Sequence, residues 1–364
     1  MGELNLAVMR GDGIGPEVVT AAVECVRAAA AAEGARVGFT ELPVGLAALD
    51  SHGSTLPPHT LERLADFEGW ILGPVSHQRY PAGDARYPNP SGVLRKHFDL
   101  SANVRPAVSH PGVRTVARDV DLVIVRENTE GFYADRNVLD GNGELRPTED
   151  VVVSVRVVTR RASERVAEAA FALAAARRSR LTVVHKANVL KRGDGLFLDA
   201  CRDVSRRYPG VTVDDHLVDA FAAALVTRPQ DFDVVVTTNM FGDILSDLAA
   251  GLTGGLGLAP SLNVGSTRAM AQAVHGSAPD IAGRGIANPL AEIGSAGLLL
   301  DWLGTRHSLP SLGRAGARIR GAVSAVLADP GLHTPDLGGP AGTRELLDGV
   351  LAAIDGAGHD TVPG

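Results

Sequence analysis

Residues 233–247 read DVVVTTNMFGDILSD. The first half is a short continuous run rich in β-branched residues, which is typical of a strand buried on both faces of a sheet. The second half, from Asn239, begins a helix. The segment therefore predicts a buried strand at Asp233–Thr238 that leads directly into a helix, which is a unit of α/β folds.

The same alternation of strand and helix extends through the chain. Short apolar runs predict strands at Leu4–Met9, Trp70–Leu72, Val120–Val125, Leu181–Val184 and Val234–Val236, and Ala/Leu-rich stretches predict helices at Ser163–Arg177 and Ala341–Ile354. This pattern predicts an α/β protein. The stretch Val151–Thr159 alternates more evenly and follows a Gly/Asn/Pro-bearing loop at Asp140–Pro147, so it predicts a two-sided strand or a projecting hairpin outside the main sheet.

The composition indicates a globular protein with room for two domains, because 45% of its 364 residues are hydrophobic and 21% are charged. A net charge of -7 gives no general attraction for nucleic acid or anionic lipid, so an anionic ligand needs a local cluster of cations. Cys25 and Cys201 are expected to be buried thiols, which suits a reducing cytoplasm. We expect no signal peptide and no membrane span, since no run approaches 18 uninterrupted apolar residues.

The glycine-rich segment Arg10–Glu17 follows a strand and opens a helix at Pro16. Its spacing is G-x-G-x-G-P and not the G-x-G-x-x-G that binds a pyrophosphate, so it does not predict a Rossmann fold. Two interpretations stay open. The segment is either a tight turn that lets a ligand or another backbone come close, or a direct contact to a cofactor.

Two aspartates follow the strand at Asp233–Thr238. Asp243 and Asp247 lie four residues apart on one helix face, where two like charges repel unless a cation joins them. A hard divalent ion is the natural partner of such a pair. The alternative is that the helix dipole favours a carboxylate near the N-terminus, which explains Asp243 better than Asp247.

Lysine is rare in this chain, since the 35 basic residues include only Lys96, Lys186 and Lys191. Lys186 directly follows a predicted strand. Lysine, unlike arginine, can lose its proton near neutral pH and can therefore act as a general base. For Lys96 and Lys191 a solvated surface charge is the simpler interpretation.

Three arginines, Arg95, Arg105 and Arg126, lie at ends of predicted elements. If they converge, they suit a substrate with two or three carboxylates, because a guanidinium grips a carboxylate with two hydrogen bonds. Taken singly, each is explained equally well by a surface ion pair. Tyr133 is one of only four tyrosines and is either a proton donor at a loop or a packed aromatic residue.

Taken together, these segments resemble the isocitrate/isopropylmalate dehydrogenase family of decarboxylating β-hydroxyacid dehydrogenases, and the isocitrate and homoisocitrate members in particular. The matching motifs lie at residues 11–17, 94–96, 102–106, 125–131, 185–188, 218–220, 239–247, 275–283 and 286–289. They occur in the family's order from about residue 5 to residue 345.

The resemblance implies a fold of two α/β domains with a mixed sheet, distinct from the Rossmann fold. Residues 1–99 and 257–364 would form a discontinuous cofactor-binding domain. Residues 100–256 would form a domain for substrate, metal and dimerisation. The resemblance also implies a homodimer, in which an arm at 140–159 pairs with the arm of the second copy.

The resemblance further implies a role for each matching residue. Arg95, Arg105 and Arg126 would hold the carboxylates of a malate, with Asn188 nearby. Asp243 and Asp247, with Asp219 from the second copy, would hold Mg²⁺ or Mn²⁺. Lys186 of the second copy would accept the proton of the substrate hydroxyl, and Tyr133 would return a proton to C3 after CO₂ is lost.

The segment after His275 corresponds to the family's dinucleotide loop. The residues implied to contact the cofactor are His275, Gly276, Ser277, Ala278, Asp280 and Asn288. Asp280 stands where NAD-linked relatives carry an aspartate that accepts hydrogen bonds from ribose hydroxyls. A carboxylate there would repel a 2′-phosphate, so NAD is the expected cofactor.

The family's substrate choice depends on the helix just before Arg95. This chain carries Asn89 and Ser91 there, which offers little apolar surface to a branched alkyl group and matches the polar groups of isocitrate enzymes in exchanged order. Isocitrate or homoisocitrate is therefore the expected substrate. 3-Isopropylmalate, tartrate, malate, or a phosphonate analogue held by His77, Arg79 and Arg86 remain alternatives, as does a non-catalytic regulatory subunit.

Overall fold

The computed structural model describes residues 4–81, 87–133 and 143–356, and it is built around one ten-stranded mixed sheet. In sheet order the strands are β2 (Val37–Glu41), β1 (Leu4–Met9), β3 (Gly69–Leu72), β12 (Ala269–Ala271), β11 (Leu262–Val264), β4 (Ala102–Val108), β5 (Asp121–Glu127), β10 (Val234–Thr237), β8 (Arg180–His185) and β9 (Thr212–Leu217). The strands are parallel except where β11 and β4 pair antiparallel with their neighbours. The predicted α/β fold with a mixed sheet is confirmed.

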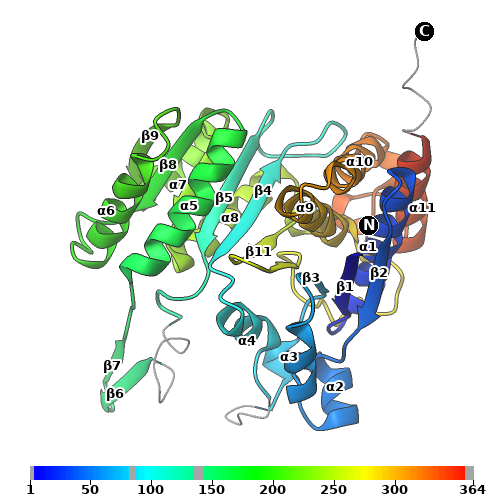
Figure 1. Ribbon diagram of the computed structural model, residues 1–364, viewed down its shortest axis with the longest axis horizontal. Helices are drawn as coiled ribbons and strands as arrows, with labels where there is room; N and C mark the ends of the chain where they lie inside the picture. Colours follow the sequence, from blue (N-terminus) through cyan, green and yellow to red (C-terminus); the bar gives the residue numbers. More distant parts are fainter. Residues whose placement is uncertain (1–3, 82–86, 134–142, 357–364) are drawn as a thin grey trace.

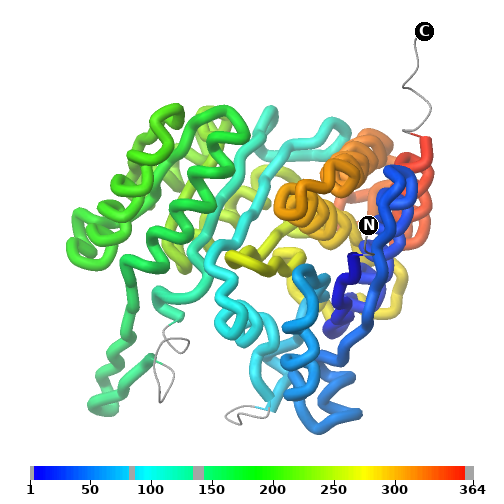
Figure 2. Tube along the Cα trace, viewed as in Figure 1, coloured from blue at the N-terminus to red at the C-terminus, as the bar shows by residue number. Residues whose placement is uncertain are grey.

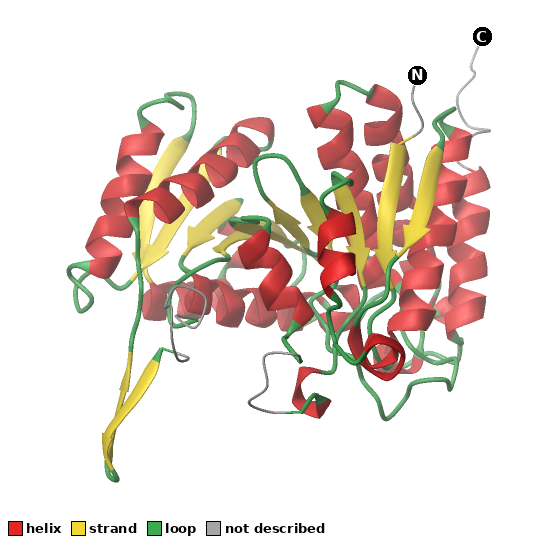
Figure 3. Cartoon of the chain, turned by 60° about the horizontal axis from the view of Figure 1, so that its bottom comes forward, coloured by secondary structure: helices red, strands yellow, loops and turns green. Residues whose placement is uncertain are grey.

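Helices cover both faces of the sheet (Figures 1 and 3). Beside the first strands lie α1 (Gly15–Ala32), α9 (Leu290–Arg306), α10 (Pro310–Leu327) and α11 (Thr343–Gly356), and the other half of the sheet carries α5 (Arg160–Ala176), α6 (Gly193–Ser205), α7 (Val218–Thr227) and α8 (Asn239–Thr253). Three shorter helices are α2 (Gly45–His52), α3 (Pro58–Leu64) and α4 (Pro90–His97). Each helix and strand expected from periodicity overlaps an observed element.

The strand residues of the central sheet alternate between two cores. Val123 and Val125 of β5 pack with α5 and α6, whereas Leu122 and Ile124 pack with α7 and α8 on the opposite face. This alternation explains why the strands read as continuous apolar runs, since both faces of the sheet are covered.

The two ends of the chain lie in the same half of the molecule. Figure 2 shows the blue N-terminal segments beside the orange and red C-terminal helices, with the green middle of the chain on the other side. The core of the first half joins α1 with α9, α10 and α11. The discontinuous first domain, with its boundaries at residues 99, 100, 256 and 257, stays a prediction.

A hairpin of β6 (Glu144–Thr148) and β7 (Val151–Ser154) projects from the body of the molecule (Figures 1 and 3). Every residue of both strands is exposed, including Leu145 and Val152, each at 60%. The strand expected over 151–159 ends at Ser154 in the structure. Beyond it, Val157 forms an isolated bridge with Gly131. Residues 140–142 of the expected arm lie outside the described residues.

Two further expectations concern the cysteines and the membrane. Cys25 and Cys201 are buried free thiols, and burial raises the pKa of Cys25 to about 12. Within residues 4–81, 87–133 and 143–356, none of the helices combines the length and the apolar character that crossing a membrane requires.

Candidate active site

The glycine-rich turn that opens α1 packs against another backbone. A Cβ at Gly13 would lie 1.9 Å from the carbonyl oxygen of Ser277, and Ile14 N donates to that same oxygen at 2.9 Å. Gly13 also has φ +58°, which favours glycine. The buried carboxylate of Asp12 stabilises the turn, because it accepts hydrogen bonds from Ser76 N and the Tyr80 hydroxyl. The segment is therefore a tight turn that lets another backbone come close, and its Ile14 also lines the pocket described below.

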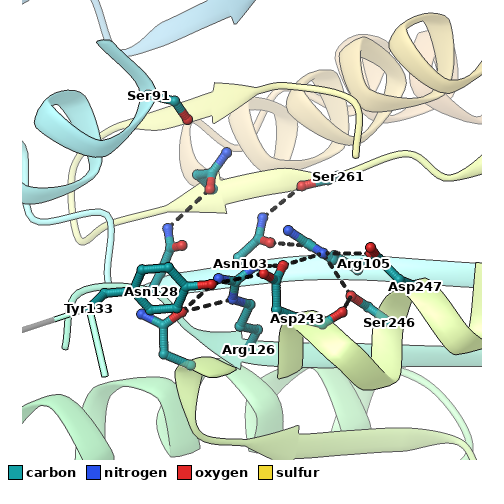
Figure 4. Close-up of polar contacts among 12 residues, drawn as sticks. Ser91, Asn103, Arg105, Arg126, Asn128, Tyr133, Asp243, Ser246, Asp247 and Ser261 are labelled. Atoms are coloured by element: carbon teal, nitrogen blue, oxygen red, sulfur yellow. Dashed lines mark hydrogen bonds and ion pairs between the residues drawn. The ribbon is translucent and has the colours of Figure 1, made fainter. Parts of the chain in front are cut away.

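A cluster of arginines and aspartates lies between β4, β5 and the first turns of α8 (Figure 4). The Arg126 Nε and Nη2 atoms donate to Asn239 Oδ1 at 2.9 and 2.7 Å, and its Nη1 forms an ion pair with Asp243. Arg105 Nη1 donates to Ser246 Oγ at 2.7 Å. Two of the three predicted arginines therefore converge on the α8 face that carries the predicted metal ligands.

The two aspartates share Arg105. Its Nη1 lies 3.2 Å from Asp243 Oδ1 and 3.4 Å from Asp247 Oδ1. The hydroxyl of Tyr133 donates to Asp243 Oδ2 at 2.9 Å. Asp243 is thus the centre of the cluster, and Tyr133 is a hydrogen-bonding member of it.

The local backbone explains why these side chains meet. Asn103 faces Arg126 in the antiparallel β4–β5 pair, and Arg105 lies two residues further along β4 on the same face. The expectation that Arg105 lies at the end of a strand is wrong, because Arg105 lies in the middle of β4 and is buried. Gly242 makes room for the neighbouring arginine, since a Cβ there would lie 2.6 Å from Arg126 Cγ.

The charges of the cluster shift the pKa values of its members. Burial, together with the charge of Arg126, lowers the pKa of Arg105 to about 10. Burial acts to raise the pKa of Asp243, but the charges of Arg126 and Arg105 outweigh it and hold that pKa below its usual value. Burial raises the pKa of Asp247 and Arg105 offsets only part of this. The two aspartates therefore differ in how readily they carry a charge.

The donor set on α8 fits a hard divalent cation only in part. Asp243 and Asp247 supply two carboxylates one helical turn apart, which are the oxygen ligands that Mg²⁺ and Mn²⁺ prefer. Among the described residues, however, no three acidic, histidine or cysteine side chains come together to form a metal site. Asp219 lies elsewhere, in the first turn of α7. One copy of the chain thus supplies only part of the expected ligand set.

Lys186 and Asp219 form a second, separate group. Lys186 directly follows β8, and its Nζ forms an ion pair with Asp219, whose pKa this hydrogen bond lowers. The backbone N–H of Lys186 donates to Asp194 at 2.5 Å, and the buried Asp194 also pairs with Arg156 at 2.6 Å. Asn188 is exposed on the turn after Lys186. Buried contacts therefore hold the backbone at Lys186. The side chain of Lys186 pairs with Asp219, whose side chain is mostly exposed.

The substrate-selecting segment forms α4, with Asn89 at its N-cap position. Ser91 Oγ donates to Gln272 Oε1 at 2.7 Å, and Arg95 Nη2 donates to the same oxygen at 3.2 Å. Gln272 was not predicted, because it lies far from α4 in the sequence and belongs to no motif. Arg79 and His77 are exposed, and Arg86 lies outside the described residues.

Four of the six predicted cofactor residues line one pocket of about 610 Å³. Its lining includes His275, Gly276, Ala278 and Asn288 together with Ile14, Gly257, Ile281, Ile286, Pro335 and Asp336. Asn288 Nδ2 donates to Asp336 Oδ2 at 3.1 Å. The remaining two residues do not line this pocket: Ser277 is buried against Ser76, and Asp280 is exposed beside it. Asp336 is a further pocket residue that no sequence motif had indicated.

Comparisons with known proteins agree with the motifs. The family model described as isocitrate/isopropylmalate dehydrogenase matches residues 5–350. The chain is 44% identical over 355 residues to an isocitrate/homoisocitrate dehydrogenase of Thermus thermophilus, covering 96% of this chain and 98% of that protein. It is 42% identical over 356 residues to a 3-isopropylmalate dehydrogenase of Methanothermobacter thermautotrophicus, covering 98% of this chain and 100% of that protein.

A solved structure shows the same fold. The crystal structure of isocitrate dehydrogenase from Methylococcus capsulatus matches with a TM-score of 0.85 and 42% sequence identity, covering 96% of this chain and 99% of that one. The matches therefore extend over nearly the whole chain in both sequence and structure. This protein belongs to the isocitrate/isopropylmalate dehydrogenase family.

Proposed function

We propose that this protein is a NAD-linked dehydrogenase, dependent on Mg²⁺ or Mn²⁺, that oxidises and decarboxylates isocitrate or homoisocitrate. The observation that carries the proposal is the convergence of Arg105, Arg126 and Tyr133 on Asp243. Two guanidinium groups beside a pair of carboxylates suit a ligand that brings both carboxylates and a cation into the cluster.

The arginines would bind and orient the substrate. Arg105 and Arg126 would each give a substrate carboxylate some of the hydrogen bonds that they now give to Asp243, and Arg95 would approach from α4. Asp243 and Asp247 would hold the divalent ion. When bound, this ion would supply a positive charge that favours ionisation of the substrate hydroxyl, and NAD would supply the hydride acceptor.

Proton transfer would be divided between two residues. Lys186 of a second copy would accept the proton from the substrate hydroxyl. Tyr133 would donate a proton to C3 after CO₂ leaves. Tyr133 already donates a hydrogen bond to Asp243, so its hydroxyl would lie close to a substrate held beside that aspartate.

The second copy is part of the proposal for two reasons. Lys186 and Asp219 do not join the Asp243 cluster within one chain. The exposed hairpin at Glu144–Ser154 also needs a covering, because an isolated two-stranded sheet is marginally stable in water. In a homodimer, each copy would supply Lys186 and Asp219 to the active site of the other. The second copy would also cover the exposed hairpin.

The polar character of α4 supports the choice of substrate. Asn89 and Ser91 present an amide and a hydroxyl where an isopropyl group would need apolar contacts. Tartrate, malate, 3-isopropylmalate and a phosphonate analogue remain alternative substrates. A regulatory subunit is disfavoured because Lys186, Tyr133, Asp219, Asp243 and Asp247 are all present.

The proposed function is tested by following NADH formation with Mg²⁺ or Mn²⁺ against isocitrate, homoisocitrate, 3-isopropylmalate, tartrate and malate. We expect turnover of one of the two tricarboxylates well above the others and complete, reversible loss of activity in EDTA. Activity that resists EDTA would exclude the metal-dependent reaction. Absence of turnover from folded, metal-loaded protein would favour a substrate with a different substituent at C3, or a regulatory subunit.

Shared sites are tested by mixing two inactive variants, Lys186→Ala and Asp247→Asn, after unfolding and refolding them together. With random pairing, half of the dimers contain one copy of each variant. In such a dimer one of the two sites has both Lys186 and Asp247, so about a quarter of the wild-type activity should return. Each variant refolded alone is the control. If the mixture stays inactive while dimers form, the two residues act in the same site of one chain.

A further inference from the structure

Asp194 holds the backbone of Lys186. It lies in the first turn of α6, its side chain is 0% exposed, and its Oδ2 accepts a hydrogen bond from Lys186 N at 2.5 Å. Two further hydrogen bonds close the turn between them, from Leu190 N to Lys186 O at 2.8 Å and from Asp194 N to Leu190 O at 2.9 Å. Lys186 is therefore joined to α6 through both its N–H and its C=O group.

The buried carboxylate of Asp194 is compensated by Arg156. Arg156 Nη2 lies 2.6 Å from Asp194 Oδ1, and the Arg156 side chain is only 11% exposed. A charge removed from water needs such a partner, together with hydrogen bonds to its remaining atoms. The two oxygens of Asp194 have separate partners, because the guanidinium contacts one and Lys186 N donates to the other.

Arg156 also reaches the N-terminus of α8. Its Nη2 donates to Thr238 Oγ1 at 3.3 Å, and Thr238 is the N-cap residue of α8. Its guanidinium lies over the rings of Phe132 and Phe241, at 5.7 and 5.8 Å from their centres. Arg156 therefore joins the start of α6 to the helix that carries the candidate metal ligands.

The side chain of Lys186 has much weaker support than its backbone. Its Nζ pairs with Asp219, whose side chain is 67% exposed, and an exposed ion pair holds a flexible four-carbon chain only loosely. The position of the ammonium group therefore depends on where the backbone is held. A shift of about 1 Å in a reacting group can lower a rate by about a hundredfold.

We propose that Asp194 is a positioning residue for the general base Lys186, and that Arg156 is the buried cation that keeps Asp194 in place. The inference rests on the proposed function, because it assumes that Lys186 accepts a proton from the substrate. In the proposed homodimer Lys186 serves the second copy, so the pair in one copy would position the base in the site of the other.

The test compares two double variants that differ only in the acceptor for Lys186 N. Both carry Arg156→Met, so neither leaves a buried charge unpaired. Arg156→Met/Asp194→Asn keeps an oxygen for Lys186 N, whereas Arg156→Met/Asp194→Leu has nearly the same shape and no acceptor. We expect kcat to be about tenfold lower in the leucine variant than in the asparagine variant, with KM for substrate and NAD within about threefold.

Two further variants complete this comparison. Asp199→Asn, at an exposed position of the same helix, is the control that should keep the wild-type kcat. If the leucine variant does not fold, Arg156→Met/Asp194→Ala replaces it, because alanine also lacks the acceptor and favours a helix. Thermal unfolding establishes that each variant is folded at the assay temperature.

A second experiment separates positioning from folding by using mixed dimers. One chain carries Lys186→Ala, the other carries Asp247→Asn, and both carry Arg156→Met and Asp194→Asn. Asp194→Leu then takes the place of Asp194→Asn in only one of the two chains. The working site receives Lys186 from the Asp247→Asn chain, so Asp194→Leu there should give about tenfold less activity than in the Lys186→Ala chain. A purely structural role predicts equal activity for the two placements.

Equal kcat in the two double variants, or equal activity of the two placements, would overturn the inference and leave the proposed function intact. If Lys186→Ala keeps a normal kcat, or if the wild-type protein oxidises no malate derivative, the proposed function fails and the inference fails with it. If mixing Lys186→Ala with Asp247→Asn restores no activity, the sites are not shared, and the comparison of the two double variants decides the inference.

Discussion

The two parts of the candidate active site differ in how the chain holds them. In the cluster around Asp243, the side chains of Arg126 and Arg105 are only 3% and 7% exposed, and each makes several polar contacts. In the other part, the side chains of Lys186 and Asp219 are 23% and 67% exposed. In the first part the arginines are buried, although the side chains of Asp243 and Asp247 are 37% and 51% exposed. In the second part the ion pair depends on Asp219, which is mostly exposed.

This difference has an energetic meaning. Removing one member of a buried ion pair leaves the other charge without compensation, which is strongly destabilising. An exposed pair contributes little to stability, because water screens its charges. The buried cluster should therefore couple folding to activity, while Lys186 and Asp219 should affect activity alone. The following predictions test that contrast.

The largest effect is expected for Lys186→Ala. Loss of the proposed general base should lower kcat by about a thousandfold. The Tm should stay unchanged, because the lysine ammonium group pairs only with the exposed Asp219 among the described residues. Steady-state kinetics and thermal unfolding measure the two quantities. Lys191→Ala is the control, since Lys191 is an exposed lysine five residues away. A normal kcat in Lys186→Ala would remove the general-base assignment.

Asp243→Asn should instead affect both activity and stability. The free energy of unfolding should fall by about 2 kcal/mol, less than for a fully buried pair because the Asp243 side chain is 37% exposed. The physical reason is that Arg126 and Arg105 lose their shared counter-charge. Denaturant unfolding measures the change, with Asp219→Asn as the control that should keep wild-type stability. Equal stability of the two variants would contradict the contrast between the two parts.

Asp280, an exposed residue beside the proposed cofactor pocket, is a third position for the comparison. Replacing Asp280 by Lys and Ile281 by Tyr should shift the ratio of kcat/KM for NAD over NADP by about a hundredfold toward NADP, because a cation replaces a charge that repels the 2′-phosphate. Since Asp280 is exposed, Tm should change little. If the ratio stays the same, the ribose of the cofactor does not reach Asp280.

The last prediction concerns the pH dependence of stability and Glu130, which joins the buried cluster to the base of the hairpin. Its backbone oxygen accepts from Asn239, and its carboxylate accepts from Thr159 N and Oγ1. Burial raises the pKa of Glu130 from its ordinary value of 4.5 to about 7. The folded protein therefore holds a proton that the unfolded chain releases, and stability should fall as pH rises from about 4.5 to 7.

Glu130→Gln should remove this part of the pH dependence, which amounts to at most about 3 kcal/mol for a shift of this size. Unfolding by denaturant at several pH values measures it. Glu149→Gln, at an exposed glutamate in the turn of the hairpin, is the control. If the free energy of unfolding of the wild-type protein does not change between pH 4.5 and 7, folding does not raise the pKa of Glu130.

Much of the site could be predicted from residue spacing and motifs. The strand at Asp233–Thr238 and the helix after it place Asp243 and Asp247 on one face, and both features are present in β10 and α8. The convergence of Arg105 and Arg126 could only be a hypothesis, because it depends on the antiparallel pairing of β4 with β5. Spacing along a single chain does not determine which strands become neighbours.

The sequence by itself determined the local elements, the family motifs and the types of charged group available. These follow from periodicity and side-chain chemistry, which act over a few residues. Only the tertiary structure decided that Ser91 gives its proton to Gln272, that the glycine-rich turn packs on Ser277, and that Lys186 pairs with Asp219. Such contacts join residues distant in the chain, and their geometry arises only when the packed helices and sheet bring those residues together.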